Sequence, residues 1–274
     1  MTTEREWSRY RIVGPGVELL EASFVTHVYE RHFHDMYAIG VTVRGIQRFR
    51  CGGVLHDSTP GDVIIIRPGE SHDGEAGTRD GYAYLMFYVA EPLLREVIVD
   101  VSADQRVTLR GGVLLRDPAL AHALSGAWRS MSEQPASLMT EERFLRALCG
   151  LAAGLRIEDM ASARPPVPTL ARVRDYLHDH LRERLTLAEL ASIAGMSRFQ
   201  LTRRFERTYG LPLHAYHLQV RLREAKRRLA NGESISRVAL DLGFSDQSHM
   251  HRRFKAAFGV TPGQWQLASV ASVR

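Results

Sequence analysis

LTRRFERTYGLP, residues 201–212, recurs further along the chain as MHRRFKAAFGVTP, residues 250–262. In both copies two arginines immediately precede a phenylalanine, and a glycine follows it five positions later. Upstream of each copy, ASIAG at 191–195 has a counterpart in ALDLG at 239–243. Self-similarity over this length indicates one supersecondary unit that is used twice.

Each copy has the pattern of a helix-turn-helix. Thr186 and Glu189 predict a capping box that starts a short helix, and Gly195 supplies a tight turn. Ser197 and Gln200 predict a second capping box, which opens the next helix. A short helix, a glycine turn and a second capped helix are typical of units that bind DNA.

The second copy and the connection between the copies follow the same logic. A short helix is expected over 235–243, and Ser245 is expected to be the N-cap of a helix over 246–258. Residues 212–229 predict one long connecting helix, because Asn231 and Gly232 form a good C-terminal stop.

A helical wheel separates two faces on the second helix of each unit. Leu201 with Phe205, and Met250 with Phe254, lie on the inner side as core anchors. Arg203 and Arg252 lie outward in mid-helix, where a guanidinium can contact guanine O6 and N7. The other outward residues are Phe199, Thr202 and Glu206 in the first helix, and Ser248, His251 and Lys255 in the second. The flanking arginines Arg198, Arg204, Arg207 and Arg253 suit phosphates.

Net charge differs between the part of the chain that holds the two copies and the part before it. Residues 169–274 carry 18 Lys and Arg against 9 Asp and Glu, a net +9, whereas residues 1–168 carry 18 against 22, a net −4. A basic half joined to a mildly acidic half is typical of a nucleic-acid-binding domain attached to another domain.

The boundary between the halves is expected at the proline-rich stretch 162–168, SARPPVP, because proline cannot continue a helix. We therefore predict a domain over 1–161, a linker over 162–168 and a helical domain over 169–274. Before the linker, residues 10–90 contain short β-branched and aromatic runs between Gly-rich turns, which predicts a sandwich or small barrel.

Residues 118–155 have a helical period instead, with Leu120, Leu124 and Trp128 on one stripe. These helices could cap the β domain or pair with a second copy of the chain. We predict a homodimer, with Phe144, Leu148, Leu151 and Leu155 at or near the interface.

The C-terminal sequence closely resembles the AraC/XylS family of bacterial transcription regulators, most densely in GFSDQSHMHRRFKAAFGVTP at 243–262. The resemblance implies seven helices and two recognition helices that enter successive major grooves. By position, it implies that Phe199, Thr202, Arg203, Ser248, His249 and Arg252 face bases. The resemblance also implies that the protein activates transcription through contact with RNA polymerase.

The N-terminal half resembles the cupin-type sensor domain of many members, through His32-Phe-His34 and through GDVIIIRPGESH at 61–72. Tyr37, Ala38 and Ile39 stand where metal-binding cupins have a glutamate, so we expect no metal and no other cofactor. The fold class expected for the whole chain is α+β: a cupin-like barrel with appended helices, followed by an all-α domain.

We interpret the chain as a DNA-binding regulator, not an enzyme, that responds to a small polar metabolite. The residues expected around the effector are His34, Tyr37, Glu70, His72, Tyr84 and Tyr88. One alternative is a regulator that senses a metal directly at His32, His34 and His72, and a weaker one is a cupin metalloenzyme with a metal at the same histidines.

Cellular placement follows from simple counts. Cys51 and Cys149 are the only cysteines and form no CxxC motif, which suits a reducing compartment. The N-terminus is charged and has no leader pattern, and no apolar run is long enough to cross a bilayer. We expect a cytoplasmic protein whose partners are double-stranded DNA, a small-molecule effector, RNA polymerase and a second copy, with no membrane.

Overall fold

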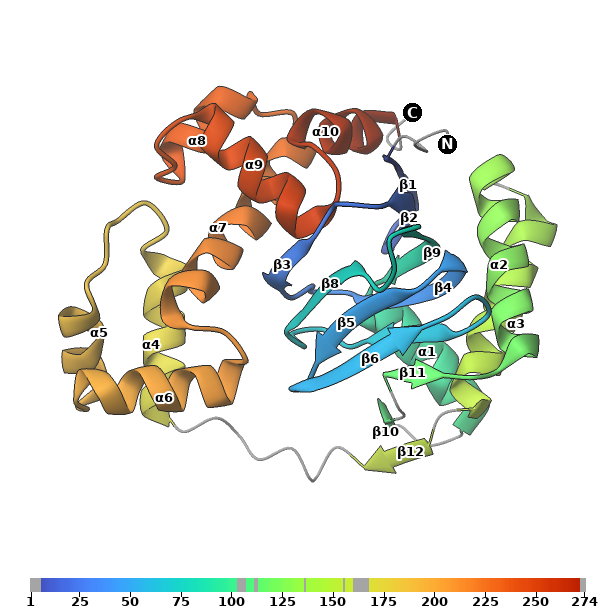
Figure 1. Cartoon of the computed structure of the whole chain (residues 1–274), viewed down its shortest axis with the longest axis horizontal. Coiled ribbons are helices and arrows are strands. Elements are labelled where there is room, and N and C mark those ends of the chain that lie inside the picture. Colours follow the sequence, from blue (N-terminus) through green and yellow to red (C-terminus); the bar gives the residue numbers. More distant parts are fainter. Residues whose placement is uncertain are drawn as a thin grey trace.

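The computed structural model describes residues 6–102, 107–110, 113–135, 137–154, 156–159 and 168–271. β-Strands fill the middle of the molecule, with two long helices on one side and a purely helical domain on the other (Figure 1). Most of the predicted linker and Leu155 lie outside the described residues. The expected α+β fold with a β-rich N-terminal domain and a helical C-terminal domain is confirmed.

Two antiparallel sheets form the N-terminal barrel. The larger sheet has the order β1 (Trp7–Gly14), β2 (Val17–Phe24), β9 (Tyr82–Val89), β4 (Tyr37–Gly45), β7 (Val63–Ile66) and β11 (Leu114–Leu115). The smaller sheet has the order β3 (Tyr29–His32), β8 (His72–Ala76), β5 (Gln47–Cys51) and β6 (Val54–Ser58). A separate pair joins β10 (Val107–Arg110) to β12 (Arg156–Asp159).

Strand alternation gives the larger sheet two buried faces. On β9, Tyr84 and Met86 point into the barrel, whereas Leu85 and Phe87 pack on the helices outside it. Successive residues of a strand point to opposite faces, so a strand buried on both faces becomes continuously apolar. This explains why residues 82–89 are a continuous apolar and aromatic run.

The outer face of the larger sheet is covered by α1 (Glu91–Ser102), α2 (Pro118–Glu133) and α3 (Leu138–Gly154). The sequence did not predict α1. The predicted interface residues Phe144, Leu148 and Leu151 are at most 4% exposed, and the Phe144 ring lies 5.4 Å from that of Phe87. These three side chains belong to the chain's own core, because the sheet needs an apolar cover. In this arrangement they expose almost no surface to a second copy, and their place at or near a dimer interface stays a prediction.

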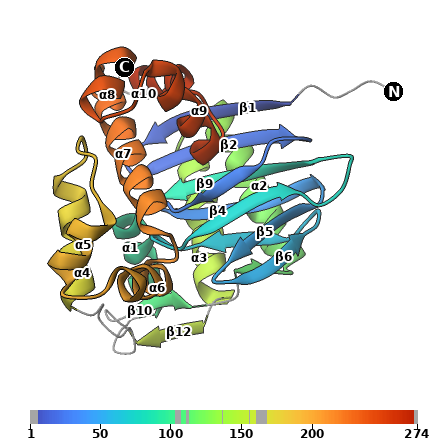
Figure 2. The same cartoon turned by 60° about the vertical axis from the view of Figure 1, so that its left-hand side comes forward.

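Seven helices build the described part of the C-terminal domain, as the family resemblance implied. They are α4 (Pro168–Asp179), α5 (Leu187–Ala194), α6 (Arg198–Tyr209), α7 (Leu213–Ala230), α8 (Ile235–Asp241), α9 (Gln247–Phe258) and α10 (Pro262–Ala271). Helix α7 is the predicted long connection, and Figure 2 shows it running between the two helix-turn-helix units. Pro168 is the first residue of α4 rather than the last of a linker.

The two domains share part of one core. Barrel side chains such as Leu20 and Tyr88 lie in the same hydrophobic cluster as Leu222, Phe254 and Trp265 of the helical domain. Strand β3 packs on α7 and α9, and β1 packs on α10. Within the described ranges, no helix has the length and apolarity that a bilayer crossing requires.

Candidate functional site

Helix α6 is held by its caps and its inner face. Ser197 Oγ accepts from the Gln200 N–H at 3.2 Å, and Gln200 Oε1 accepts from the Ser197 N–H at 3.2 Å, which confirms the predicted capping box. Leu201 and Phe205 are fully buried, as predicted. The opposite face therefore points away from the domain core, and its Phe199 is 68% exposed.

Helix α9 repeats this arrangement with one difference. Met250 and Phe254 are fully buried, in the positions of Leu201 and Phe205. The N-cap is Asp246, whose carboxylate accepts from the His249 N–H at 2.6 Å, so the prediction of Ser245 was wrong by one residue. A carboxylate is the stronger acceptor at a helix N-terminus, because it also meets the positive end of the helix dipole.

The turns before the two helices differ in how much space they leave. Gly195 and Gly243 both have a positive φ, +61° and +72°. A Cβ on Gly195 would meet nothing within 4 Å, whereas one on Gly243 would lie 2.6 Å from the Arg182 carbonyl oxygen. The second turn therefore requires glycine for two reasons, backbone conformation and close packing.

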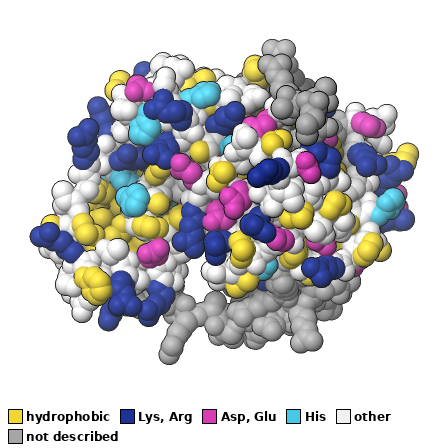
Figure 3. Space-filling view, viewed as in Figure 1, with side chains coloured by type: hydrophobic (Ala, Val, Ile, Leu, Met, Phe, Trp, Pro, Cys, Tyr) yellow, Lys and Arg dark blue, Asp and Glu magenta, His cyan; other side chains and the backbone are white. Residues whose placement is uncertain are grey.

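Most of the residues predicted to contact DNA lie on exposed surface. Exposed on α6 and α9 are Arg198, Phe199, Arg203, Arg207, Ser248, His251, Arg252 and Lys255. Thr202 and His249 are half-buried, and each makes a local hydrogen bond, to Arg198 O at 2.9 Å and to Ser245 Oγ at 3.1 Å. Lys and Arg side chains are spread over the helical domain, on the left of Figure 3.

Strand β3 of the barrel contacts both of these helices. Glu30 accepts from Arg253 of α9 at 2.9 Å and 3.0 Å, and Arg31 pairs with Glu206 of α6 at 3.9 Å. The Tyr29 hydroxyl lies against Gly259, the C-cap of α9. Arg253, which the sequence suggested for phosphate contact, is thus paired with the barrel in this arrangement.

Three buried histidines meet inside the barrel, beside β3. His32 and His72 are register partners on β3 and β8, and His34 follows two residues after His32. Their ring centroids are 4.2 Å to 5.0 Å apart, and the three side chains are 2% to 9% exposed. Burial lowers the pKa of all three imidazoles, that of His72 to about 4, so each is neutral at pH 7.

The histidines fit a divalent transition metal better than the sequence suggested. One ring nitrogen from each comes within 4.8 Å of the others. Neutral imidazole is a common ligand of zinc, copper, nickel and iron, and three such ligands with one open position form a known type of site. No carboxylate joins the cluster among the described residues, in line with the missing cupin glutamate.

The cavity inside the barrel beside the histidines is small. The cavity beside the three histidines is about 30 Å³, the space of one water molecule. His34, His72, Tyr84 and Tyr88 of the predicted effector residues line it. Tyr37 instead lies on the outer face of the sheet, which the helices cover, since it alternates with Ala38. Glu70 lies in a turn, where it pairs with Arg67 at 3.0 Å. The structure therefore brings together four of the six predicted residues.

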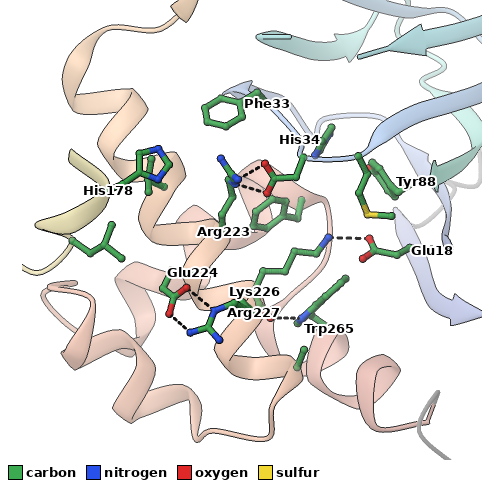
Figure 4. Close-up of a pocket in the computed structure, with 16 residues that line it drawn as sticks. Glu18, Phe33, His34, Tyr88, His178, Arg223, Glu224, Lys226, Arg227 and Trp265 are labelled. Carbon is green, nitrogen blue, oxygen red and sulfur yellow. Dashed lines mark hydrogen bonds and ion pairs between the residues drawn. The ribbon is translucent and has the colours of Figure 1, made fainter. Parts of the chain in front are cut away.

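A larger cavity, of about 440 Å³, lies between the barrel and α7. His34 and Tyr88 reach it from the barrel side, and Phe33, Val220, Phe258 and Trp265 provide apolar wall. Three cations of α7 line it (Figure 4). Arg223 pairs with Asp35, the Nζ of Lys226 lies 2.9 Å from Glu18 Oε2, and Arg227 pairs with Glu224 of its own helix. Residues of α7 were not predicted for any site, because a half-buried cation on a helix has no sequence signature.

Comparisons with known proteins agree with this arrangement. Residues 14–148 match the model of the AraC-like ligand binding domain, and residues 190–268 match a helix-turn-helix domain model. The chain is 26% identical to the HTH-type transcriptional regulator YbfI of Bacillus subtilis, over 85% of this chain and 86% of that protein. It is 21% identical to the virulence regulon transcriptional activator VirF of Yersinia enterocolitica, over 93% of this chain and 98% of VirF.

Among solved structures, the fold is similar to that of an apo ToxT variant from Vibrio cholerae. The TM-score is 0.60 at 13% identity, over 93% of this chain and 98% of ToxT. The likeness covers both domains and therefore supports the two-domain fold.

Proposed function

The chain belongs to the AraC family of transcription regulators, and we propose that it acts as a ligand-controlled activator. It binds DNA through its helix-turn-helix units, and its N-terminal half is an AraC-like ligand-binding domain. The activating role is supported by the similarity to VirF, which is itself named an activator. We further propose that it acts in the cytoplasm, where it meets its promoter and RNA polymerase.

The observation that carries the DNA-binding mode is the equivalence of α6 and α9. Arg203 and Arg252 occupy the same offset from the buried pair in each helix, and both are exposed. An exposed arginine in mid-helix suits bidentate contact with guanine. Two such helices in one domain would read two base sets about one helical turn apart, as in paired helix-turn-helix units.

Selection from a random duplex library with the full-length protein tests this mode. We expect a bipartite motif, and Arg203→Ala and Arg252→Ala should each cost about 1–3 kcal/mol and relax one half of it. Arg9→Ala removes an arginine that is 72% exposed on β1 and serves as the matched control. If both variants select the wild-type motif with full preference, the assignment of reading residues is wrong.

We propose that the effector binds in the cavity between the domains. The sequence suggested a small polar metabolite, but the walls described above favour a molecule with an anionic group and an apolar body. Because Arg223 and Lys226 are paired with Asp35 and Glu18, such an anion would compete with carboxylates that join the domains. Ligand binding would thereby change how firmly the helical domain is held.

Binding of a panel of alkyl and aryl carboxylates, followed by thermal shift, tests the effector site. Arg223→Gln should abolish the shift. Arg227→Gln is the matched control, because Arg227 lines the same cavity but pairs at 2.6 Å with Glu224 of its own helix. Equal thermal shifts in both variants would show that the effector binds at another site.

We still propose a homodimer, but with a different contact surface between the two copies. On α3, Leu138 and Leu145 are 81% and 44% exposed and lie on one flank of the buried stripe, at the outer face of the helix. We propose that this outer face meets a second copy. Leu145→Glu should then lower the sedimentation coefficient without unfolding the chain, and an unchanged dimer would exclude the face.

A further inference from the structure

We propose that His32, His34 and His72 bind one divalent first-row transition ion of the zinc class, and that this ion strengthens the contact of β3 with α6 and α9. The first part concerns the barrel alone. The second rests on the proposed function, since it treats the ion as a regulator of DNA binding.

Two of the rings make the hydrogen bond that commonly supports a metal-bound histidine. His32 Nδ1 lies 2.7 Å from the Glu30 carbonyl oxygen, and His72 Nδ1 lies 3.0 Å from that of Glu70. Each Nδ1–H therefore donates to the backbone and leaves the lone pair on Nε2 free for a metal. Such a bond from the second ring nitrogen is the usual outer-shell support of a metal-bound histidine.

The cavity beside the rings has the size for the rest of the coordination shell. Three protein ligands plus one water is a common zinc arrangement, and about 30 Å³ holds that water but excludes a metabolite. Gln47 also lines this cavity, and its Oε1 is buried with no hydrogen-bond donor in reach among the described residues. A buried acceptor of this kind needs a donor, and a metal-bound water supplies one.

The proposed ligand His32 belongs to β3, the strand that contacts both α6 and α9. Glu30 and Arg31, the two residues before it, pair with Arg253 of α9 and Glu206 of α6. The Glu30 carbonyl also accepts from the His32 ring. An ion that fixes His32 therefore fixes the backbone from which both ion pairs project, so the loaded protein holds α6 and α9 to the barrel more firmly.

A metal titration of the full-length protein tests the site. Protein stripped with a chelator and then dialysed is titrated with Zn²⁺ against a chromophoric competitor. We expect one ion per chain. His34→Gln and His72→Gln should each weaken binding by about 100-fold or more, beyond the 10- to 100-fold loss typical of an outer-shell partner. His56→Gln is the matched control, because His56 stacks on Phe49 in the same barrel and lies outside the cluster.

X-ray absorption of the zinc-loaded wild type keeps the test independent of how the variants fold. Three imidazole nitrogens and one oxygen are expected in the first shell. A sulfur ligand, fewer imidazoles, or equal affinity in wild type and both histidine variants would overturn the site.

The regulatory part is measured with a labelled duplex of the selected motif. Loaded wild type should bind it several-fold more weakly than stripped wild type, and the histidine variants should not respond to zinc. Equal affinity of loaded and stripped wild type would overturn the coupling. Failure to select any motif would instead refute the proposed function and leave the metal titration standing.

Discussion

Replacement of Lys226 by methionine tests how strongly the domains are joined. Lys226 Nζ lies 2.9 Å from Glu18 Oε2 and 4.0 Å from the centroid of the Trp265 ring. The two charged side chains are only 23% and 13% exposed. Methionine keeps much of the apolar stem but removes the ammonium, so it leaves Glu18 without its cation.

The expected loss of unfolding free energy in Lys226→Met lies between two limits. Removing one partner of a fully buried pair costs about 3–5 kcal/mol, whereas an exposed pair contributes about 0–1 kcal/mol. Tyr10 still donates to Glu18, which reduces the cost, and loss of the cation–π contact with Trp265 adds about 1 kcal/mol. We therefore expect Lys226→Met to lower the free energy of unfolding by about 2–3 kcal/mol.

A double-mutant cycle with Glu18→Gln isolates the pair. Urea unfolding of the wild type, both single variants and the double variant is followed by tryptophan fluorescence. The double variant should be more stable than the sum of the single effects predicts, by about 1–2 kcal/mol, because it leaves no unpaired charge. If the single effects add to within about 0.5 kcal/mol, the ion pair does not join the domains.

Three further perturbations test individual parts of the fold. Leu148→Glu should lower the free energy of unfolding by more than about 4 kcal/mol and unfold the N-terminal domain, because it buries an unpaired charge. Leu145→Glu should leave the circular dichroism spectrum unchanged, because Leu145 is exposed. Gly243→Ala should cost clearly more than Gly195→Ala, which should cost about 1 kcal/mol from backbone strain alone, as measured by thermal melts. Burial lowers the pKa of His217 to about 4 from 6.5, so the unfolded chain binds a proton that the native chain does not between these pH values. Stability should fall as the pH drops through that window, and a His217→Gln variant with the same pH slope as wild type would show that another group is responsible.

The helical domain could be predicted closely because its signals are local. The capping box at Ser197 and the buried anchors Leu201 and Phe205 follow from spacing within a single helix. The N-cap of α9 was misplaced by one residue because Ser245 and Asp246 are both good caps, and spacing alone does not choose between adjacent candidates.

The N-terminal domain was harder, because its decisive contacts join distant residues. Phe144 and Leu148 form a good apolar stripe, but a stripe does not reveal whether a sheet of the same chain or a second chain covers it. Tyr37 was placed in the pocket although strand alternation sends it to the opposite face from Ala38. The cavity between the domains depends on how α7 docks on the barrel, and no local pattern encodes that docking.

The shared core of barrel and helices has a consequence for how such regulators can be recombined. Phe254 and Trp265 are at most 3% exposed, and they lie in one cluster with barrel residues such as Leu20. If the helical domain were grafted onto a foreign sensor, the apolar surface that now faces the barrel would meet water, and a soluble chimera would need that surface redesigned. The barrel and the helical domain of this protein are therefore adapted to each other and are not interchangeable. We expect a chimera to fold best when strands β1 and β3 are transferred together with helix α10.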